Sequence, residues 1–367
     1  MDENKQFDIL VNSESMRRYA FASCKEQFKL KANPEYMYNL LITLLPKEIK
    51  TVEFLNLKEP PSPEGIEKLW ELLENLNIRN SLMILKNADL RMIADNIEKA
   101  WSRLINEVKE KHSNEHSFVQ VLPFGKKYRF QVKDIVTPIE VIKINKSMFK
   151  QCQLPTEITF YTFHEVLLTD FGKIVIQGEP GIGKSVHVKY LLNSWANNKW
   201  KEFNDKLFLL ISIKDVFIES RLNNNTSLYQ LIKEQNFPKD SCIDETMIKE
   251  WFKEKRKDII LFIDGADELN SGDNNSNSWV TSLNSIIEGV NCSLPTVVWC
   301  RNWRAEEILF SCDLALELIG FNRQQLKEFF QKFEDNTKCN SFIEELDKAN
   351  IGMLKRNMKI KSTKIFS

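Results

Sequence analysis

Apolar residues in the first third of the chain recur every three or four positions, which is the spacing of one helical face. The clearest case begins at Pro63, a residue that suits the first turn of a helix. Two shorter helices are predicted upstream, around Leu40 and Val52. The apolar positions that predict helices downstream are Ile66, Leu69, Trp70, Leu73 and Leu76, then Leu82, Leu85 and Leu90, and finally Ile97, Trp101, Leu104 and Ile105. We therefore expect a helical bundle at 33–110, preceded by a flexible lead-in at 1–32.

The pattern then changes. Apolar and polar residues alternate around Phe130, so we predict that 111–161 is a linker with extended segments. Farther on, short continuous apolar runs alternate with helical stretches. The runs lie at 174–176, 207–211, 259–263, 297–299 and 316–319. Such runs imply a parallel sheet buried on both faces. We therefore expect an α/β domain at 162–335, with a parallel sheet of about five strands and flanking helices, and a short basic tail at 336–367.

A glycine-rich segment follows the first of these runs. Its residues are Gly178, Glu179, Pro180, Gly181, Ile182, Gly183, Lys184 and Ser185. The segment matches G-x-x-x-x-G-K-[ST], and the strand before it and the amphipathic helix after it are the context in which this loop binds nucleotide phosphates. The glycines let successive backbone N–H groups point at phosphate oxygens. Lys184 would reach the β and γ phosphates, and Ser185 would offer its hydroxyl to Mg²⁺. All eight residues are predicted to bind nucleotide.

Carboxylates follow the run at 259–263. Asp264 lies at the predicted carboxyl end of a strand, which is where open α/β sheets bind ligands. We predict that Asp264, like Ser185, holds Mg²⁺, directly or through water. Asp267 and Glu268 come one short turn later and are candidates for orienting or deprotonating an attacking water.

Two further residues lie near these motifs. Arg301 ends another apolar run and suits contact with a γ-phosphate, although an arginine at a strand end is as often a plain surface residue. His187 lies on the helix after the glycine loop, where we expect it to pack or to face solvent rather than to act in catalysis.

The composition excludes several classes of partner. The 51 basic and 51 acidic residues give a net charge of zero, without a basic stripe, so nucleic acid is not expected as a partner. No apolar run is long enough to span a bilayer. The N-terminus lacks the pattern of a secretory signal, and the seven cysteines form no C-x-x-C pair. We therefore expect a cytoplasmic protein without a membrane span.

With these residues in view, the chain resembles the NACHT family, signalling P-loop NTPases of the STAND type that include the NOD-like receptors. GEPGIGKS at 178–185 looks like that family's Walker A motif. LFIDGADEL at 261–269 looks like its Walker B motif with an extra acidic pair, and VVWCRNWRA at 297–305 resembles its sensor 1 strand. The segment at 318–321, Leu-Ile-Gly-Phe, is similar to the end of its nucleotide-binding core.

The resemblance implies ATP or ADP and Mg²⁺ as ligands, since nothing in the loop itself distinguishes adenine from guanine. It also implies a switch, closed with ADP and open with ATP, that is at most a slow Mg²⁺-dependent ATPase. The implied residue roles are phosphate and Mg²⁺ binding for Lys184 and Ser185, completion of the metal site for Asp264, assistance to hydrolysis for Asp267 or Glu268, and γ-phosphate sensing for Arg301.

The helical unit at 33–110 occupies the place where family members carry a death-fold module. Its pattern resembles a death-effector bundle, and an unrelated helical extension fits it equally well. The resemblance implies death-fold adaptor proteins and self-association as partners, in innate-immune or cell-death-like signalling. Family receptors continue into further domains, whereas this chain stops at Ser367, which indicates either a member without a sensor or a truncated product. The alternative function is a constitutive adaptor or decoy that uses the P-loop domain as a scaffold.

Overall fold

The structure is a computed structural model of the 367-residue chain. It describes residues 10–32, 37, 63–120, 129–132, 141–143, 160–218, 226–269, 278–288, 294–318, 325, 327–328 and 331. The chain divides into two compact units. The first comprises 1–107 with 238–255, and the second comprises 108–237 with 256–367.

The first unit is helical. Its helices are α2 (Glu14–Ala22), α3 (Lys25–Lys31), α5 (Pro63–Asn75), α6 (Ile78–Asn87), α7 (Arg91–Glu98), the first half of α8 (Ala100–Glu115) and α14 (Glu245–Glu254). Trp70 is buried in its core, with ring centroids 5.3 Å from Phe21 and 4.6 Å from Phe28. Because α2 and α3 supply these phenylalanines, the prediction of a flexible lead-in at 1–32 is wrong for residues 10–32.

The helices predicted from Pro63 onward are confirmed, with two corrections to their limits. Asp89 adopts a left-handed conformation with φ of 60°, so the chain leaves α6 before Leu90, which was predicted to belong to the same helix. Ile97 and Trp101 lie in two separate helices, α7 and α8, rather than in one. The two helices predicted upstream of Pro63 fall almost entirely outside the described residues.

The second unit is built on a seven-stranded sheet with the order β4-β3-β9-β5-β8-β7-β6. Five neighbouring strands are parallel. They are β5 (Lys173–Gln177), β6 (Leu207–Ser212), β7 (Ile259–Asp264), β8 (Thr296–Cys300) and β9 (Leu314–Leu318). Every one of them corresponds to a predicted apolar run, so the α/β prediction with its parallel sheet is confirmed.

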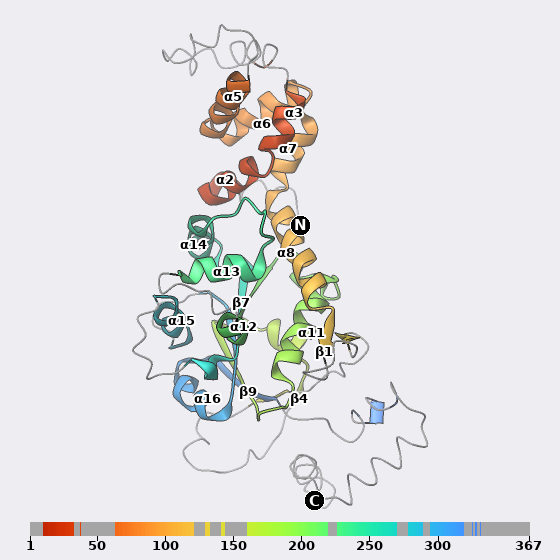
Figure 1. Cartoon of the computed structure of the whole chain (residues 1–367), viewed down its shortest axis with the longest axis vertical. Coiled ribbons are helices and arrows are strands. Elements are labelled where there is room, and N and C mark those ends of the chain that lie inside the picture. Colours follow the sequence, from red (N-terminus) through yellow and green to blue (C-terminus); the bar gives the residue numbers. More distant parts are fainter. Residues whose placement is uncertain are drawn as a thin grey trace, which may run out of the picture. The chain divides into compact units, whose positions relative to one another are not determined.

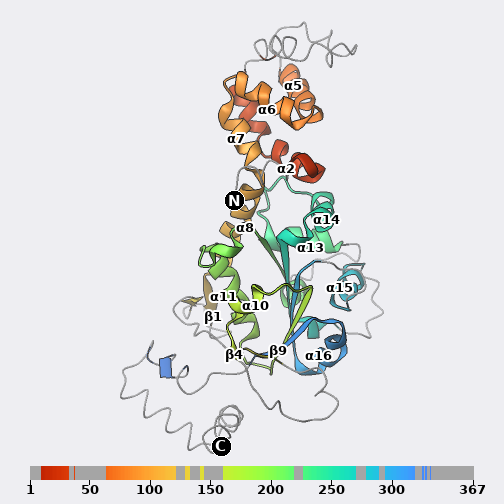
Figure 2. The same ribbon diagram turned by 180° about the vertical axis from the view of Figure 1, so that it is seen from behind.

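Helices cover both faces of this sheet. They are α10 (Phe163–Leu167), α11 (Lys184–Ala196), α12 (Ile213–Ile218), α13 (Leu228–Asn236), α15 (Ser278–Glu288) and α16 (Asn302–Ile308). The short 3-10 helices are η3 (Lys201–Phe203), η4 (Arg256–Asp258), η5 (Ala266–Glu268) and η6 (Leu309–Ser311). Figures 1 and 2 show α11 on one side of the strands and α15 and α16 on the other. Every residue of β5, β6, β7 and β8 is buried, which explains why their sequences are continuously apolar rather than alternating.

The prediction that 111–161 is only a linker is wrong in part. Two strands at its end, β3 (Val141–Lys143) and β4 (Phe160–Tyr161), extend the sheet, and β3 pairs antiparallel with β9. They cover an edge of β9 that would otherwise expose unpaired backbone groups. Strands this short leave almost no periodicity in the sequence. Farther upstream, β1 (Phe118–Gln120) pairs antiparallel with β2 (Arg129–Gln131), and β2 is the extended segment that the alternation around Phe130 predicted. The tail at 336–367 lies outside the described residues.

The opposite edge of the sheet, at β6, is paired by side chains. The side-chain amide of Asn236, on α13, accepts a hydrogen bond from the N–H of Leu210 at 2.6 Å and donates one to its carbonyl at 2.8 Å. Gln235 makes the same two bonds with Ser212, at 2.8 and 3.1 Å. Two amides therefore take the place of a neighbouring strand, and they fix the end of α13 to β6.

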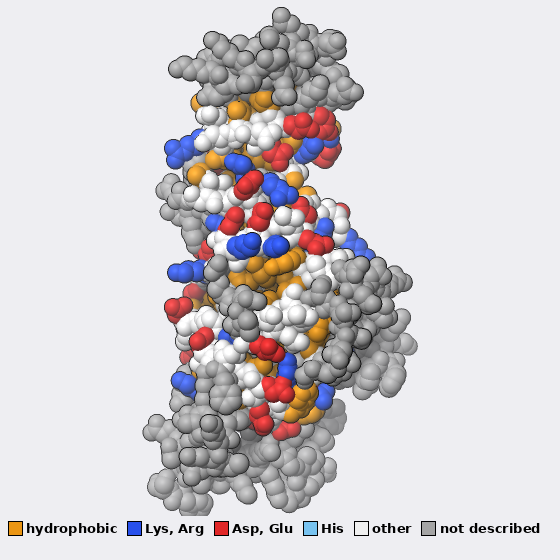
Figure 3. Space-filling view, turned by 90° about the vertical axis from the view of Figure 1, so that its left-hand side faces the viewer, with side chains coloured by type: hydrophobic (Ala, Val, Ile, Leu, Met, Phe, Trp, Pro, Cys, Tyr) orange, Lys and Arg blue, Asp and Glu red, His pale blue; other side chains and the backbone are white. Residues whose placement is uncertain are grey.

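The surface and the helices show two further features. Figure 3 presents a face on which acidic and basic side chains are interspersed rather than separated by sign. Among the described residues, none of the helices combines the length and the apolar character that crossing a membrane requires.

We predict that Asn236→Leu lowers the stability of the protein markedly. Asn236 is fully buried, and leucine would leave the N–H and the carbonyl of Leu210 without partners. Each unsatisfied buried group costs about 1–3 kcal/mol. The measurement is urea denaturation followed by circular dichroism. Gln230→Leu, on the solvent side of the same helix, is the control and should change stability by less than about 0.5 kcal/mol. Equal stability of the two variants would show that the amide pairing contributes nothing.

Candidate functional site

The glycine loop connects β5 to α11, as predicted. The loop starts beside β8, because the N–H of Gly178 donates to the carbonyl of Cys300 at 3.3 Å. Gly181 and Gly183 have φ of 78° and 101°, values that strain any residue with a Cβ atom. Gly183 is also the N-cap of α11, so the loop delivers its backbone N–H groups to a helix N-terminus. This conformation is the one that phosphate binding requires.

Lys184, the first residue of α11, folds back over this loop. Its Nζ donates to the carbonyl oxygens of Gly178 at 2.7 Å and of Glu179 at 3.1 Å. The side chain is half-buried, and this burial lowers the pKa of Lys184, while nearby Asp267 opposes the shift. The ammonium group is therefore held within the loop rather than in bulk solvent.

Ser185 and Asp264 meet across the site. Asp264 is the last residue of β7 and is 9% exposed. Burial raises its pKa to about 6, and a hydrogen bond from the Ser185 hydroxyl counteracts part of this shift. A buried carboxylate beside a hydroxyl is a donor set that suits Mg²⁺, which prefers oxygen ligands. The two residues predicted to hold the metal are thus adjacent in the structure.

Asp267 contacts Arg301 through two hydrogen bonds. The Nε of Arg301 lies 2.9 Å from one carboxylate oxygen of Asp267, and the backbone N–H of Arg301 donates to the other at 3.1 Å. The Asp267 side chain is only 6% exposed, whereas that of Arg301 is 48% exposed. Gly265, with φ of 83°, makes the turn that places η5 here. Asp267 therefore fixes Arg301, the residue that follows β8, while about half of the Arg301 side chain is exposed to solvent.

Glu268 differs from Asp267 in its surroundings. It is partly exposed, and burial followed by the charge of Asp267 raises its pKa, while Lys214 and Arg301 oppose the shift. A carboxylate with a raised pKa and access to solvent has the properties of a general base.

Sequence reasoning missed one contact of the site. Asn302, the first residue of α16, donates from its side-chain amide to Glu179 in the glycine loop at 3.2 Å. Asn302 follows Arg301 directly, so its position after a strand was the signal that could have identified it. The segment 301–302 thus contacts both the acidic cluster and the loop.

His187 packs in the apolar interior. It is 3% exposed, and its ring centroid lies 5.3 Å from that of Phe163 and 6.4 Å from that of Trp299. Burial lowers its pKa to about 4, so the ring is neutral at physiological pH. Of the two roles expected for His187, packing and facing solvent, the structure shows packing.

The model of the NACHT domain family matches residues 173–337. The chain contains a NACHT domain. This domain is a P-loop NTPase of the STAND type, and its start coincides with that of β5. The resemblance drawn from the three motifs is thereby confirmed, and the NACHT domain implies nucleotide binding.

One solved structure is similar over part of the chain. It is a chain of the E. coli MS115-1 HORMA:CdnC:Trip13 complex, with 16% sequence identity and a TM-score of 0.31. The match covers 49% of this chain and 60% of that chain, which is less than two thirds of its length.

We predict that Asp264→Asn stabilises the protein in buffer without nucleotide or metal. The pKa of Asp264 is about 6 in the folded state and near 3.8 when the chain is unfolded, so the ionised carboxylate destabilises the folded state above pH 6. Asparagine removes this charge and still accepts a hydrogen bond. The stability gain should be about 1–3 kcal/mol at pH 7.5.

This gain should shrink as the pH falls through 6, because the folded wild-type protein then takes up the proton that neutralises Asp264. Thermal midpoints at pH 7.5 and 5.0 check the prediction. A gain that is the same at both pH values would contradict a raised pKa at this carboxylate.

Proposed function

We propose that the protein is an ADP/ATP-binding signalling switch whose NACHT domain changes conformation with the bound nucleotide. The observation that carries the proposal is the conformation of the glycine loop, in which Gly181 and Gly183 have positive φ and Lys184 bonds back to the carbonyls of the loop. The glycine loop and Lys184 would hold the phosphates, and Ser185 and Asp264 would hold Mg²⁺. Bound Mg²⁺ neutralises phosphate charge. The preference for adenine follows from the family alone.

We assign different roles to the two acidic residues that follow Asp264. Asp267 is committed to Arg301 by two bonds, so we assign it a positioning role. Glu268 is the residue that would orient or deprotonate an attacking water. Arg301, anchored at its backbone and at Nε, would direct its remaining N–H groups toward a γ-phosphate.

We also propose what the switch controls. The N-terminal helical unit recruits partners when ATP replaces ADP, in signalling of the innate-immune or cell-death kind. Death-fold adaptors are the partners to test. A buried carboxylate such as Asp264 costs folding free energy, which favours a working nucleotide site over a pure scaffold.

We predict that Mg²⁺-ADP and Mg²⁺-ATP raise the thermal midpoint of the wild-type protein and that Lys184→Ala abolishes the rise. A ligand at one hundred times its dissociation constant stabilises the folded state by about 2.7 kcal/mol. GTP, as a comparison, should produce a smaller rise. The control is Lys201→Ala, an exposed lysine of η3, which should respond as the wild type does. A folded wild-type protein that shows no rise with any nucleotide would leave the constitutive adaptor or decoy as the function.

We predict that Glu268→Gln lowers single-turnover ATP hydrolysis by about 100-fold while nucleotide affinity stays nearly unchanged, because the amide cannot accept a proton from water. Asp267→Asn should instead weaken the preference for ATP over ADP, since Arg301 loses its charged anchor. The measurements are quenched-flow hydrolysis and titration calorimetry. Full hydrolysis by Glu268→Gln together with none by Asp267→Asn would transfer the role of base to Asp267.

A further inference from the structure

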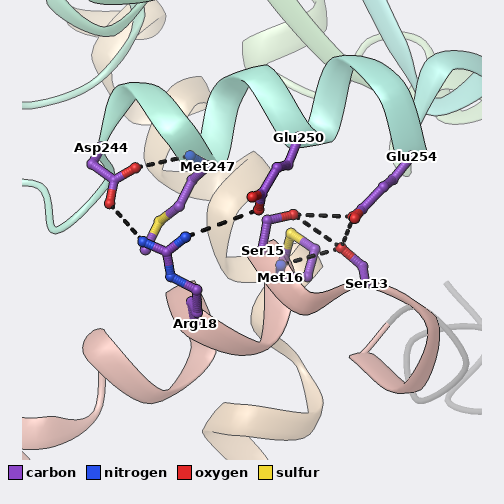
Figure 4. A network of polar contacts seen from close by, with 8 residues as sticks. All are labelled: Ser13, Ser15, Met16, Arg18, Asp244, Met247, Glu250 and Glu254. Carbon is purple, nitrogen blue, oxygen red and sulfur yellow. Dashed lines mark hydrogen bonds and ion pairs between the residues drawn. The ribbon is translucent and has the colours of Figure 1, made fainter.

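Helix α14 belongs to the N-terminal helical unit although it lies inside the NACHT domain in sequence. Residues 238–255 fall between α13 and β7, yet they group with residues 1–107. Figure 4 shows α14 lying alongside α2, with polar contacts at both ends of the pair. The helical unit is therefore discontinuous, and one of its helices is supplied by the segment that leads to the Walker B strand.

Each of the two helices is capped by a residue that the other helix binds. Ser13, the N-cap of α2, accepts from the N–H of Met16 and donates to Glu254, the last residue of α14. Ser15 also donates to Glu254, at 3.1 Å. The Glu254 carboxylate thus lies at the N-terminus of α2, where the helix dipole favours a negative charge.

The other end of the pair repeats this arrangement in reverse. Asp244, the N-cap of α14, accepts from the N–H of Met247 at 2.8 Å and from Arg18 of α2 at 3.0 Å. Arg18 lies 4.0 Å from Glu250 as well. Because Ser13 faces Glu254 and Arg18 faces Asp244, the two helices are antiparallel (Figure 4). Separating them would disturb the caps of both.

An apolar contact lies between these polar ends. Tyr19 meets Trp251 edge to face, with ring centroids 6.1 Å apart, and both side chains are buried. The Tyr19 hydroxyl donates to Glu107 of α8 at 3.0 Å. The end formed by Arg18 and Asp244 is open to solvent, with side chains 37% and 46% exposed, whereas Ser13 and Ser15 at the other end are buried. Water therefore has access to the contacts at the Arg18 end of the pair.

Both flanks of α14 are fixed to the sheet of the second unit. On one side, Asn236 at the end of α13 is bonded to β6. On the other side, Lys206 donates to the carbonyl of Lys257 at 2.6 Å and lies 3.3 Å from Asp258, which holds η4 in place before β7. β7 then ends at Asp264. The chain thus leads from α13 through residues 237–244 into α14, and from α14 through Lys255 and η4 into β7.

We propose that the contact between α2 and α14 is the latch through which the nucleotide state controls the N-terminal helices. This inference rests on the switch proposed above. With ADP the latch is closed, and the exchange of ADP for ATP loosens it. By linkage, breaking the latch favours the triphosphate state to the same extent.

The test is hydrogen exchange of the full chain with Mg²⁺-ADP and with a nonhydrolysable Mg²⁺-ATP analogue. Backbone amides of α2 and α14 should exchange about tenfold faster with the analogue, because local opening exposes them. Amides of α6 and α7 in the same unit should not change. Thermal shifts of the same samples establish that both nucleotides bind.

Charge variants complete the test. Arg18→Glu places a like charge beside Asp244 and Glu250, so it should speed exchange in α2 and α14 with ADP and raise the affinity ratio of analogue to ADP by about fivefold. Adding Glu250→Arg to this variant restores an ion pair and should return both quantities toward those of the wild type. Asp244→Asn, which retains a capping oxygen, is the milder variant that should act in the same direction if Arg18→Glu fails to fold. Lys86→Glu, which breaks the exposed ion pair with Glu98 at 2.7 Å, is the control and should change neither quantity.

The proposal is overturned if both nucleotides bind and yet give the same exchange in α2 and α14. It is also overturned if Arg18→Glu speeds exchange without changing the affinity ratio. The absence of any thermal shift in the wild type would instead reject the nucleotide switch itself, so the two failures are distinguishable.

Discussion

The parallel register of three strands is the constraint on which the candidate site depends. Gln177 of β5 lies opposite Cys300 of β8, and Trp299 of β8 lies opposite Asp264 of β7. The three strands therefore end at the same edge of the sheet. The glycine loop, the acidic cluster and Arg301 follow these ends directly, so they meet there without any long connection. A one-residue slip of any strand would reverse its faces and separate these groups.

The site contains a group that opposes folding, and the rest of the second unit offsets its cost. Asp264 is a buried carboxylate whose pKa is raised by burial. The sheet compensates through strands that are buried on both faces and through the amides of Gln235 and Asn236, which pair its outer edge. Features that reduce stability and persist at one edge of a sheet are typical of ligand binding.

The helical unit is built from two segments that are not contiguous in sequence, 1–107 and 238–255. Its resemblance to a death-effector bundle remains a prediction, and such a bundle would have to accommodate α2, α3 and α14. α2 contributes Phe21 to the contact with Trp70 and presents Ser13 and Arg18 to α14. The helical unit therefore includes a helix whose residues lie within the segment that the NACHT family model matches.

The sequence by itself determined the features that are encoded in contiguous residues. The five parallel strands follow from continuous apolar runs, and the nucleotide loop follows from eight adjacent residues between a strand and a helix. Only the tertiary structure decided which acidic residue holds Arg301, since Asp267 and Glu268 are sequence neighbours of equal charge whose surroundings the sequence does not reveal. It also decided that residues 10–32 belong to a core and that α14 joins α2. The contact between α14 and α2 joins residues more than two hundred positions apart. The helices of residues 10–32 are too short for their periodicity to reveal a partner.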